Sequence, residues 1–238
     1  MKVLILAGGL GTRLQPLLSD QPKPMAPTGD KPFLEYLVAG LHSQGFLELV
    51  LCVGHMAAKI QDHFGSGRHF GVNITYVVER DLLGTAGAIK NANGSIKDTF
   101  IVMNGDSYLD IHYAELVEHH QQNRAVDNLV IGTLATIRVE DATNYGRLAI
   151  NTDGRITHFS EKAISGSGWI NGGIYVLEPG ILDYIPSRKA VSIERETFPL
   201  VLQQSLHLQS FPTQGFFVDI GTPEGYQIFL EHLQERTL

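Results

Sequence analysis

Short apolar runs alternate with amphipathic stretches through the first half of the chain. Each run is bounded by turn residues and rich in aliphatic side chains, which is typical of a buried strand. The predicted strands are residues 3–7, 49–53, 74–78 and 100–104, and helical patterns cover residues 33–44, 57–64 and 85–92. This alternation predicts right-handed crossovers and a mostly parallel sheet with helices on both faces. Sheets of this class bind ligands at the carboxyl ends of their strands.

The second half has a different pattern, in which strands follow one another closely. Residues 129–136, 147–150 and 156–160 are predicted strands, and Asn151-Thr152-Asp153-Gly154 is a strong hairpin signal. We expect a small antiparallel insert here, then strands at 172–177 and 216–219 and a final helix that begins at Thr222-Pro223-Glu224. Because no linker separates the halves, the sequence predicts one domain over residues 1–238. Its expected fold class is α/β, a Rossmann-like three-layer sandwich with a mostly parallel mixed sheet.

Composition narrows the range of functions. Apolar residues make up 43% of the chain and charged residues 18%, a balance typical of a folded globular protein. The formal net charge is −7 and no run of Lys or Arg occurs, which argues against nucleic acid as a partner. Cys52 is the single cysteine, so a disulfide framework is excluded. The first apolar run is too short for a signal peptide or a membrane span, and we expect a cytoplasmic protein without a membrane partner.

A glycine-rich segment follows the first predicted strand: Leu6-Ala7-Gly8-Gly9-Leu10-Gly11-Thr12-Arg13-Leu14. Its glycines let backbone N–H groups approach phosphate oxygens, and Arg13 and the later Lys23 can offset the charge of a triphosphate. Leu14 stands where a dinucleotide-binding loop has its third glycine, and no Gly-Lys-Ser/Thr of a P-loop follows. The alternative without a ligand is a tight turn between a strand and a helix.

This segment, with Lys23-Pro24-Met25, resembles the signature of the sugar-1-phosphate nucleotidyltransferases, which join a nucleoside triphosphate to a sugar phosphate and release pyrophosphate. Further motifs of the family follow in order: Glu79 with Leu83-Gly84-Thr85-Ala86-Gly87, Asn104-Gly105-Asp106, Asn144-Tyr145-Gly146, Glu161-Lys162, Asn171-Gly172-Gly173 and Val218-Asp219-Ile220-Gly221-Thr222. The resemblance implies the nucleotide-diphospho-sugar transferase type of fold, with residues 1–125 mainly binding the nucleotide and 126–238 the sugar phosphate. It places these residues at the nucleotide: Leu6, Ala7, Gly8, Gly9, Gly11, Thr12, Arg13, Glu79, Gly84 and Thr85.

Two aspartates are candidate metal ligands. Asp106 and Asp219 each come at the end of a predicted strand, so both are expected at the carboxyl edge of the same sheet. Carboxylate oxygens there can share a Mg²⁺ ion with phosphate oxygens, and the resemblance assigns both residues this role. The alternative is that each is a turn residue or a helix cap. Asp110 is interpreted as a turn residue.

Glu79 is the candidate for recognition of the base. A guanine edge offers two adjacent N–H donors and a carbonyl acceptor, so one carboxylate can accept both donors. Guanine is therefore favoured over thymine or uracil, whose single ring N–H suits an amide better, although a carboxylate could still bind them. The alternative for Glu79 is a solvated surface side chain.

The candidate sugar-phosphate site lies in the second half. Lys162 is the expected cation for the acceptor phosphate, because a point charge on a flexible stem can follow a phosphate dianion. The resemblance adds Asn104, Gly146, Glu161 and Asn171. Many relatives have proline after the Glu-Lys pair, whereas Ala163 follows here. Without the other motifs, this pair would be a solvated strand end.

The remaining conspicuous side chains are expected to be structural. His119 and His120 are adjacent on a helix and lack a cysteine partner, so we interpret them as surface residues. Trp169 and the Phe216-Phe217 pair are interpreted as packing groups.

The resemblance implies a Mg²⁺-dependent enzyme with a nucleoside triphosphate and a sugar 1-phosphate as partners. The acceptor phosphate is already a good nucleophile, so catalysis should rest on alignment and charge stabilisation. The expected catalytic residues are Arg13, Lys23, Asp106, Lys162 and Asp219.

Five features carry a closer resemblance within the family: the short chain, Glu79, the stretch 167–173, Glu194-Arg195-Glu196 and the stretch 219–224. They look most like D-glycero-D-manno-heptose 1-phosphate guanylyltransferases, which make GDP-heptose for bacterial surface polysaccharides such as lipopolysaccharide and capsule. The alternatives are a mannose-1-phosphate guanylyltransferase, a thymidylyl- or uridylyltransferase, and a nucleotide-binding regulatory subunit without turnover. A dinucleotide oxidoreductase is weakened by Leu14. The sequence does not fix the oligomeric state and is compatible with a homo-oligomer.

Overall fold

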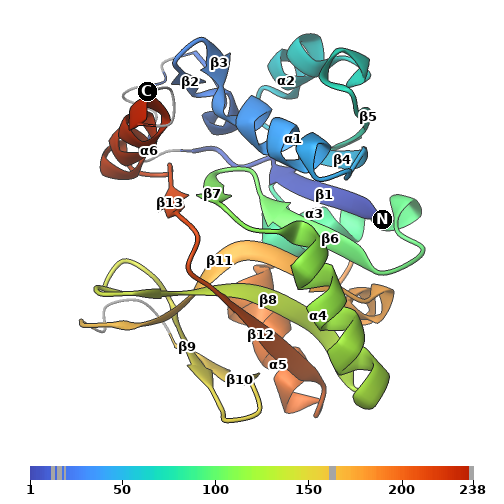
Figure 1. The fold of residues 1–238 in the computed structure, drawn as a ribbon. Helices are drawn as coiled ribbons and strands as arrows, with labels where there is room; N and C mark the ends of the chain where they lie inside the picture. The colour runs from blue at the N-terminus through green and yellow to red at the C-terminus, as the bar shows by residue number, and fades with distance from the viewer. Residues whose placement is uncertain (12–13, 15–17, 19, 161–164, 236–238) are drawn as a thin grey trace.

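A nine-stranded mixed sheet forms the centre of the protein (Figure 1). The computed structural model describes residues 1–11, 14, 18, 20–160 and 165–235. The strand order is β5-β4-β1-β6-β11-β8-β12-β10-β9. The strand bounds are β1 (Lys2–Ala7), β4 (Glu48–Val53), β5 (Asn73–Val78), β6 (Phe100–Asn104), β8 (Val130–Val139), β9 (Arg147–Ile150), β10 (Arg155–Phe159), β11 (Gly168–Leu177) and β12 (His207–Thr213).

The first four strands in this order form a parallel half-sheet. β1 pairs in parallel with β4 on one side and β6 on the other, and β5 extends the sheet beyond β4. Each of these strands includes one of the predicted apolar runs. The parallel half therefore places the ends of β1 and β6 side by side, with Leu6 opposite Asn104.

The second half of the sheet differs from the expected antiparallel insert. β8 lies inside the main sheet, antiparallel to β11 and parallel to β12. It is buried over its first eight residues, which is typical of an interior strand covered on both faces. β12 had no counterpart among the predicted strands, and it separates β8 from the β9–β10 hairpin. The hairpin itself is antiparallel as expected, and β9 also pairs with β11.

Helices cover both faces of the sheet, as expected for three layers (Figure 1). One core packs odd-numbered residues of β1, such as Ile5, against α1 (Phe33–Ser43), α2 (Ala57–Phe64), α4 (Tyr113–Val126) and α6 (Pro223–Glu235). The other core packs Leu4 against α3 (Gly84–Asn91) and α5 (Phe198–Gln203). Period-2 alternation along β1 thus separates the two cores. The expected α/β class is confirmed.

Short elements complete the fold. Two-stranded sheets form from β2 (Pro27–Thr28) with β3 (Lys31–Pro32), and from β7 (Ser107–Leu109) with β13 (Phe217–Asp219). The 3-10 helices are Lys23–Met25, Arg68–Phe70, Asn93–Ser95 and Pro179–Tyr184, and a π-helical turn covers Ile193–Thr197. Among the described helices, none has both the length and the apolar composition that a membrane span requires.

The interpretation of His120 as a surface residue is wrong. Its side chain is buried, with Nδ1 2.9 Å from Thr133 Oγ1 and Nε2 3.1 Å from Glu178 Oε1. Burial lowers the pKa of His120, although the Glu178 carboxylate opposes the shift. His120 therefore links α4 to the sheet as a hydrogen-bonded core residue.

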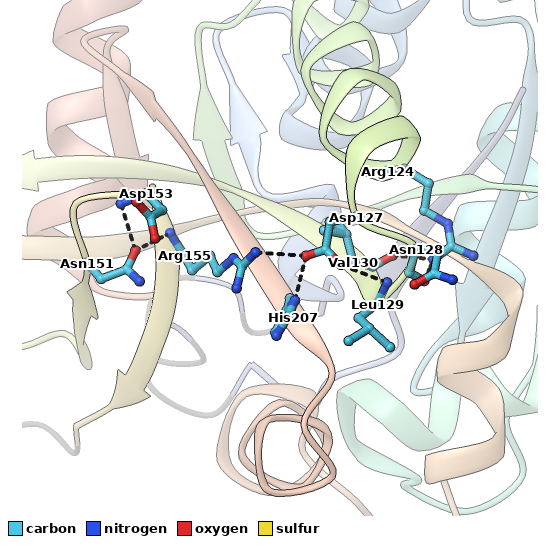
Figure 2. A network of polar contacts seen from close by, with 9 residues as sticks. All are labelled: Arg124, Asp127, Asn128, Leu129, Val130, Asn151, Asp153, Arg155 and His207. Atoms are coloured by element: carbon cyan, nitrogen blue, oxygen red, sulfur yellow. Dashed lines mark hydrogen bonds and ion pairs between the residues drawn. The ribbon is translucent and has the colours of Figure 1, made fainter.

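A polar network joins the end of α4 to the second half of the sheet (Figure 2). Asp127 Oδ2 accepts hydrogen bonds from His207 Nδ1 at 2.6 Å and Arg155 Nη2 at 3.1 Å. Its Oδ1 accepts one from the Leu129 amide at 3.1 Å. Burial would raise the pKa of Asp127, but these donors and the neighbouring charges lower it overall. The ionised carboxylate thus stabilises the junction of α4, β10 and β12.

Replacing this carboxylate should weaken the fold in a pH-dependent way. Asp127→Asn is expected to lower the melting temperature by about 2–4 °C at neutral pH, since about 1 kcal/mol of hydrogen bonding is lost. A lowered aspartate pKa stabilises the folded state above that pKa, and the contribution disappears as the pH falls through it. The difference in melting temperature between Asp127→Asn and the unmodified chain should therefore shrink at pH values below the ordinary pKa of aspartate. Thermal unfolding at several pH values measures this.

The matched control is Asp153→Asn, which changes an exposed aspartate in the neighbouring hairpin turn (Figure 2). Equal melting temperatures for the two variants at neutral pH would mean that the Asp127 network adds no stability.

Candidate functional site

The glycine-rich segment forms the wall of a pocket where β1 ends. The pocket has a volume of about 220 Å³. Its lining includes Leu6, Ala7, Gly9, Gly11, Lys23 and Asp106, all predicted site residues, together with Pro24 and Gly221. Gly11 has φ +62°, and a Cβ there would lie 2.7 Å from Lys23 Cβ. The turn therefore requires glycine at this position, and it brings Lys23 against the loop.

Asp106 and Asp219 lie close together, as expected, but Asp219 does not belong to a strand of the main sheet. Asp106 follows β6, whereas Asp219 ends β13, which pairs with β7 so that Asp219 is opposite Ser107. The Ile220 amide also donates to the Asp106 carbonyl at 3.0 Å. The expectation that both aspartates end strands of one sheet is corrected accordingly: a separate two-stranded sheet delivers Asp219.

One ammonium group lies against both carboxylates. Lys23 Nζ is 2.6 Å from Asp106 Oδ2 and 3.7 Å from Asp219 Oδ1, and the Lys23 side chain is only 8% exposed. The Gly221 amide donates to Asp219 Oδ1 at 2.6 Å and fixes that carboxylate. Lys23 therefore compensates the repulsion between the two acidic groups, in addition to lining the pocket where a triphosphate was expected.

The acidic pair fits a Mg²⁺ ion. Carboxylate oxygens are the donors this ion prefers, and Mg²⁺ commonly takes one or two protein carboxylates with phosphate oxygens and water. Within the described ranges, no group of three or more His, Cys, Asp or Glu side chains is placed to hold a metal. A bound ion would thus depend on substrate oxygens for its remaining ligands.

Glu79 lies beside the glycine loop and is half-buried. Its Oε2 accepts a hydrogen bond from the Leu83 amide at 3.2 Å, and a Cβ on Gly8 would lie 2.9 Å from its Oε1. Burial raises the pKa of Glu79, while the Leu83 amide opposes the shift. The carboxylate is therefore held against the loop rather than solvated at the surface.

The Gly84–Thr85 turn packs on the segment 191–194. Gly84 has φ +69°, and a Cβ there would lie 2.6 Å from the Val191 carbonyl oxygen. Thr85 Oγ1 accepts from the Ile193 amide at 2.8 Å and donates to Glu194 Oε2 at 3.0 Å. The Thr85 hydroxyl is thus engaged in positioning this turn.

A second and larger pocket lies on the other side of the acidic pair, with a volume of about 610 Å³. Asn104, Gly146, Asn171 and Asp219 line it, as predicted for the sugar-phosphate site or the metal. The Asn104 Oδ1 atom is buried and accepts no hydrogen bond from any residue in the described part of the chain.

Four predicted site residues, Thr12, Arg13, Glu161 and Lys162, lie outside the described residues. The roles assigned to them stay predictions.

A family model named Nucleotidyl transferase matches residues 2–236. The chain belongs to the sugar-1-phosphate nucleotidyltransferase family. It is 35% identical to D-glycero-alpha-D-manno-heptose 1-phosphate guanylyltransferase of Campylobacter jejuni over 230 residues, which cover 97% of this chain and 99% of the relative. It is 36% identical to mannose-1-phosphate guanylyltransferase of Mycobacterium tuberculosis over 94% of this chain, and it spans 62% of that relative's length.

A solved structure supports the same family fold. HddC from Yersinia pseudotuberculosis, complexed with GMP-PN, superposes with a TM-score of 0.84 at 35% identity, covering 98% of this chain and 99% of that chain. The nucleotidyltransferase type of fold expected from the sequence is confirmed.

Several residues that line the larger pocket were not among the predicted site residues. The larger pocket is also lined by Tyr145, Arg147, Glu194, Arg195 and Phe217. Tyr145 and Arg147 flank the predicted Gly146, and charged residues in the stretch 194–196 interrupt an apolar pattern. These neighbours of known motifs were the available signal.

The contact between Gly8 and Glu79 predicts a specific effect on nucleotide binding. In Gly8→Ala, the added methyl group must displace the Glu79 carboxylate, which can move at little cost to stability because it ends a flexible side chain. We expect the KM for the nucleotide to rise about tenfold while the melting temperature changes little. Steady-state kinetics of pyrophosphate release and thermal unfolding measure the two effects.

Gly40→Ala serves as the control, because nothing lies within 4 Å of a Cβ at Gly40 in α1. A normal nucleotide KM in Gly8→Ala would count against a role for the Glu79 carboxylate in its present position.

Proposed function

We propose that the chain transfers a guanylyl group from GTP to a sugar 1-phosphate, giving a GDP-sugar and pyrophosphate. The observation that carries the proposal is a pair of pockets that meet at the Lys23–Asp106–Asp219 cluster: Asp106 lines the glycine-loop pocket and Asp219 lines the larger one. Transfer of a nucleotidyl group from one substrate to another needs two binding sites that meet at one charged centre.

Guanine is the proposed base because of the position of Glu79. A half-buried carboxylate beside the phosphate loop can accept two hydrogen bonds from adjacent N–H groups of guanine. The GMP-PN complex of the related HddC chain supports the same choice.

D-glycero-D-manno-heptose 1-phosphate is the proposed acceptor. The support is the Campylobacter relative, which aligns with this chain over nearly the full length of both. Mannose 1-phosphate is the second candidate, because the Mycobacterium relative is equally similar. A GDP-heptose product would serve as a donor for surface polysaccharides.

The reaction proposed is an in-line attack of an acceptor phosphate oxygen on the α-phosphorus, with pyrophosphate as the leaving group. A Mg²⁺ ion held by Asp106 and Asp219 would supply positive charge to the phosphate oxygens. Backbone amides of the glycine loop bind the triphosphate, and Lys23 keeps the two carboxylates together. Arg13 is assigned to the triphosphate and Lys162 to the acceptor phosphate. No general base is needed.

Pyrophosphate release tests the proposal. The protein is incubated with Mg²⁺, each of four nucleoside triphosphates, and a panel of heptose, mannose and glucose 1-phosphates. Release is expected only when both substrates are present, and most with GTP and the heptose phosphate. A preference for UTP or dTTP would contradict guanine recognition, and no release with any pair would favour a non-catalytic nucleotide-binding subunit.

The acidic pair should be essential for turnover. Asp106→Asn and Asp219→Asn are each expected to lower kcat about 10²- to 10³-fold, because charge on the phosphates is no longer stabilised. Asp110→Asn is the control, since this exposed aspartate lies near the same sheet but lines neither pocket. Near-normal kcat in either pair variant would overturn the metal assignment.

Base recognition should depend on pH through Glu79. Since burial raises its pKa, the carboxylate protonates at a higher pH than an ordinary glutamate and then no longer accepts both guanine donors. We expect kcat/KM for GTP to fall on the acid side earlier than for a solvent-exposed carboxylate. Glu79→Gln should remove that acid limb and reduce the preference for GTP over UTP. A pH profile of kcat/KM that is the same in both proteins would contradict this assignment.

A further inference from the structure

Glu194 lies between the two proposed substrate sites, on the π-helical turn Ile193–Thr197. It lines the larger pocket, and its carboxylate is hydrogen-bonded to Thr85 of the proposed nucleotide site and to Tyr175, which in turn contacts Asn171 of the larger pocket. We propose that Glu194 is a positioning residue, which fixes the Gly84–Thr85 turn at the proposed nucleotide site and the larger pocket relative to each other. This inference rests on the proposed function of the two pockets.

On the nucleotide side, Glu194 Oε2 accepts two hydroxyl hydrogen bonds. Thr85 Oγ1 donates at 3.0 Å and Ser192 Oγ at 2.9 Å. The Thr85 oxygen in turn accepts from the Ile193 amide at 2.8 Å, so its single proton is committed to Glu194. The Val191 amide also donates to the Leu83 carbonyl at 2.8 Å. The turn next to Glu79 is thus attached to the segment that carries Glu194.

On the sugar side, Glu194 Oε1 accepts from the Tyr175 hydroxyl at 3.0 Å. Tyr175 is fully buried, and its oxygen accepts from Asn171 Nδ2 at 2.6 Å. Asn171 Oδ1 accepts from the Gly173 amide at 2.9 Å, within the irregular stretch of β11. Asn171, a predicted sugar ligand, is therefore oriented through Tyr175 by Glu194.

The direction of each hydrogen bond is fixed by the available protons. Burial, and then the charge of Glu194, raises the pKa of Tyr175 well above its ordinary value, so the phenol stays a donor. Three hydroxyl protons then point at one carboxylate, which only accepts. If a hydrogen-bond donor replaced one of the carboxylate oxygens, it would face one of these hydroxyl protons and could not accept it.

Glu194→Gln tests this arrangement because it keeps the shape but replaces one acceptor oxygen with an amino group. The remaining oxygen should face the two donors Thr85 and Ser192, which leaves the amino group toward Tyr175. We therefore expect the Kd for the sugar 1-phosphate to rise about tenfold and the Kd for GTP to rise less than about threefold. Glu194→Ala should raise both. Calorimetric titration of each ligand alone, with mannose 1-phosphate as the sugar probe, measures these values.

Tyr175→Phe should reproduce the sugar-side effect and add nothing in the Glu194→Gln background, since both changes break the same bond. Glu196→Gln is the matched control, because Glu196 lies on the same turn and its Oε1 accepts a hydrogen bond from the Ser192 amide at 2.9 Å. Its Kd values for both ligands should stay unchanged, and melting temperatures should agree across the Gln variants.

The outcomes separate this inference from the proposed function. If the unmodified protein binds both ligands but releases no pyrophosphate, the proposed function fails while the Kd pattern still supports the role of Glu194. If turnover is normal and Glu194→Gln behaves like Glu196→Gln, the inference fails and the function stands. Equal losses for both ligands with a lowered melting temperature would also overturn it, as would no binding of either ligand to the unmodified protein.

Discussion

The contact of two carboxylates with one buried ammonium group is the constraint on which the site depends. Asp106 and Asp219 are 113 residues apart in the sequence and would repel each other at short range. Lys23 Nζ lies within 4 Å of both and its side chain is buried, so one positive charge offsets this repulsion at short range. If the pair moved apart, the two pockets would lose the wall they have in common.

Close backbone approaches make this contact possible. A Cβ at Gly105 would lie 2.7 Å from the Leu6 carbonyl oxygen, and one at Gly225 would lie 1.9 Å from the Asp219 carbonyl oxygen. The first contact holds the Asp106 turn against β1, and the second holds α6 against the end of β13. Glycine is thus needed where chain segments touch directly, which explains why the most recognisable motifs of this family are glycine-rich.

Local sequence predicted the parallel half of the sheet well, because each strand there is a short apolar run between turn residues. It could not predict the partners of β8, since pairing with β12 depends on a strand some seventy residues later along the chain. His120 was misjudged because its polarity is balanced by Thr133 and Glu178, which only the folded chain brings to it. The Asp106–Asp219 pair was anticipated from motifs, but the β7–β13 sheet that forms it is too short to give a periodic signal. Glu194 was not predicted as a site residue for a related reason: two of its three donors, Thr85 and Tyr175, come from other segments of the chain.

The position of the acidic pair also constrains the direction of the proposed reaction. The glycine-loop pocket would hold the β- and γ-phosphates, and the larger pocket would hold the acceptor, with Asp106 on the first side and Asp219 on the second. In that arrangement, an acceptor oxygen arriving from the larger pocket would approach the α-phosphorus from a different side than the glycine loop, which is compatible with in-line displacement. A chain with a net charge of −7 must bind polyanionic substrates by local rather than overall charge. Because Lys23 is paired with two aspartates, the positive charge at the phosphates would come from the glycine-loop amides and from a Mg²⁺ ion on the acidic pair.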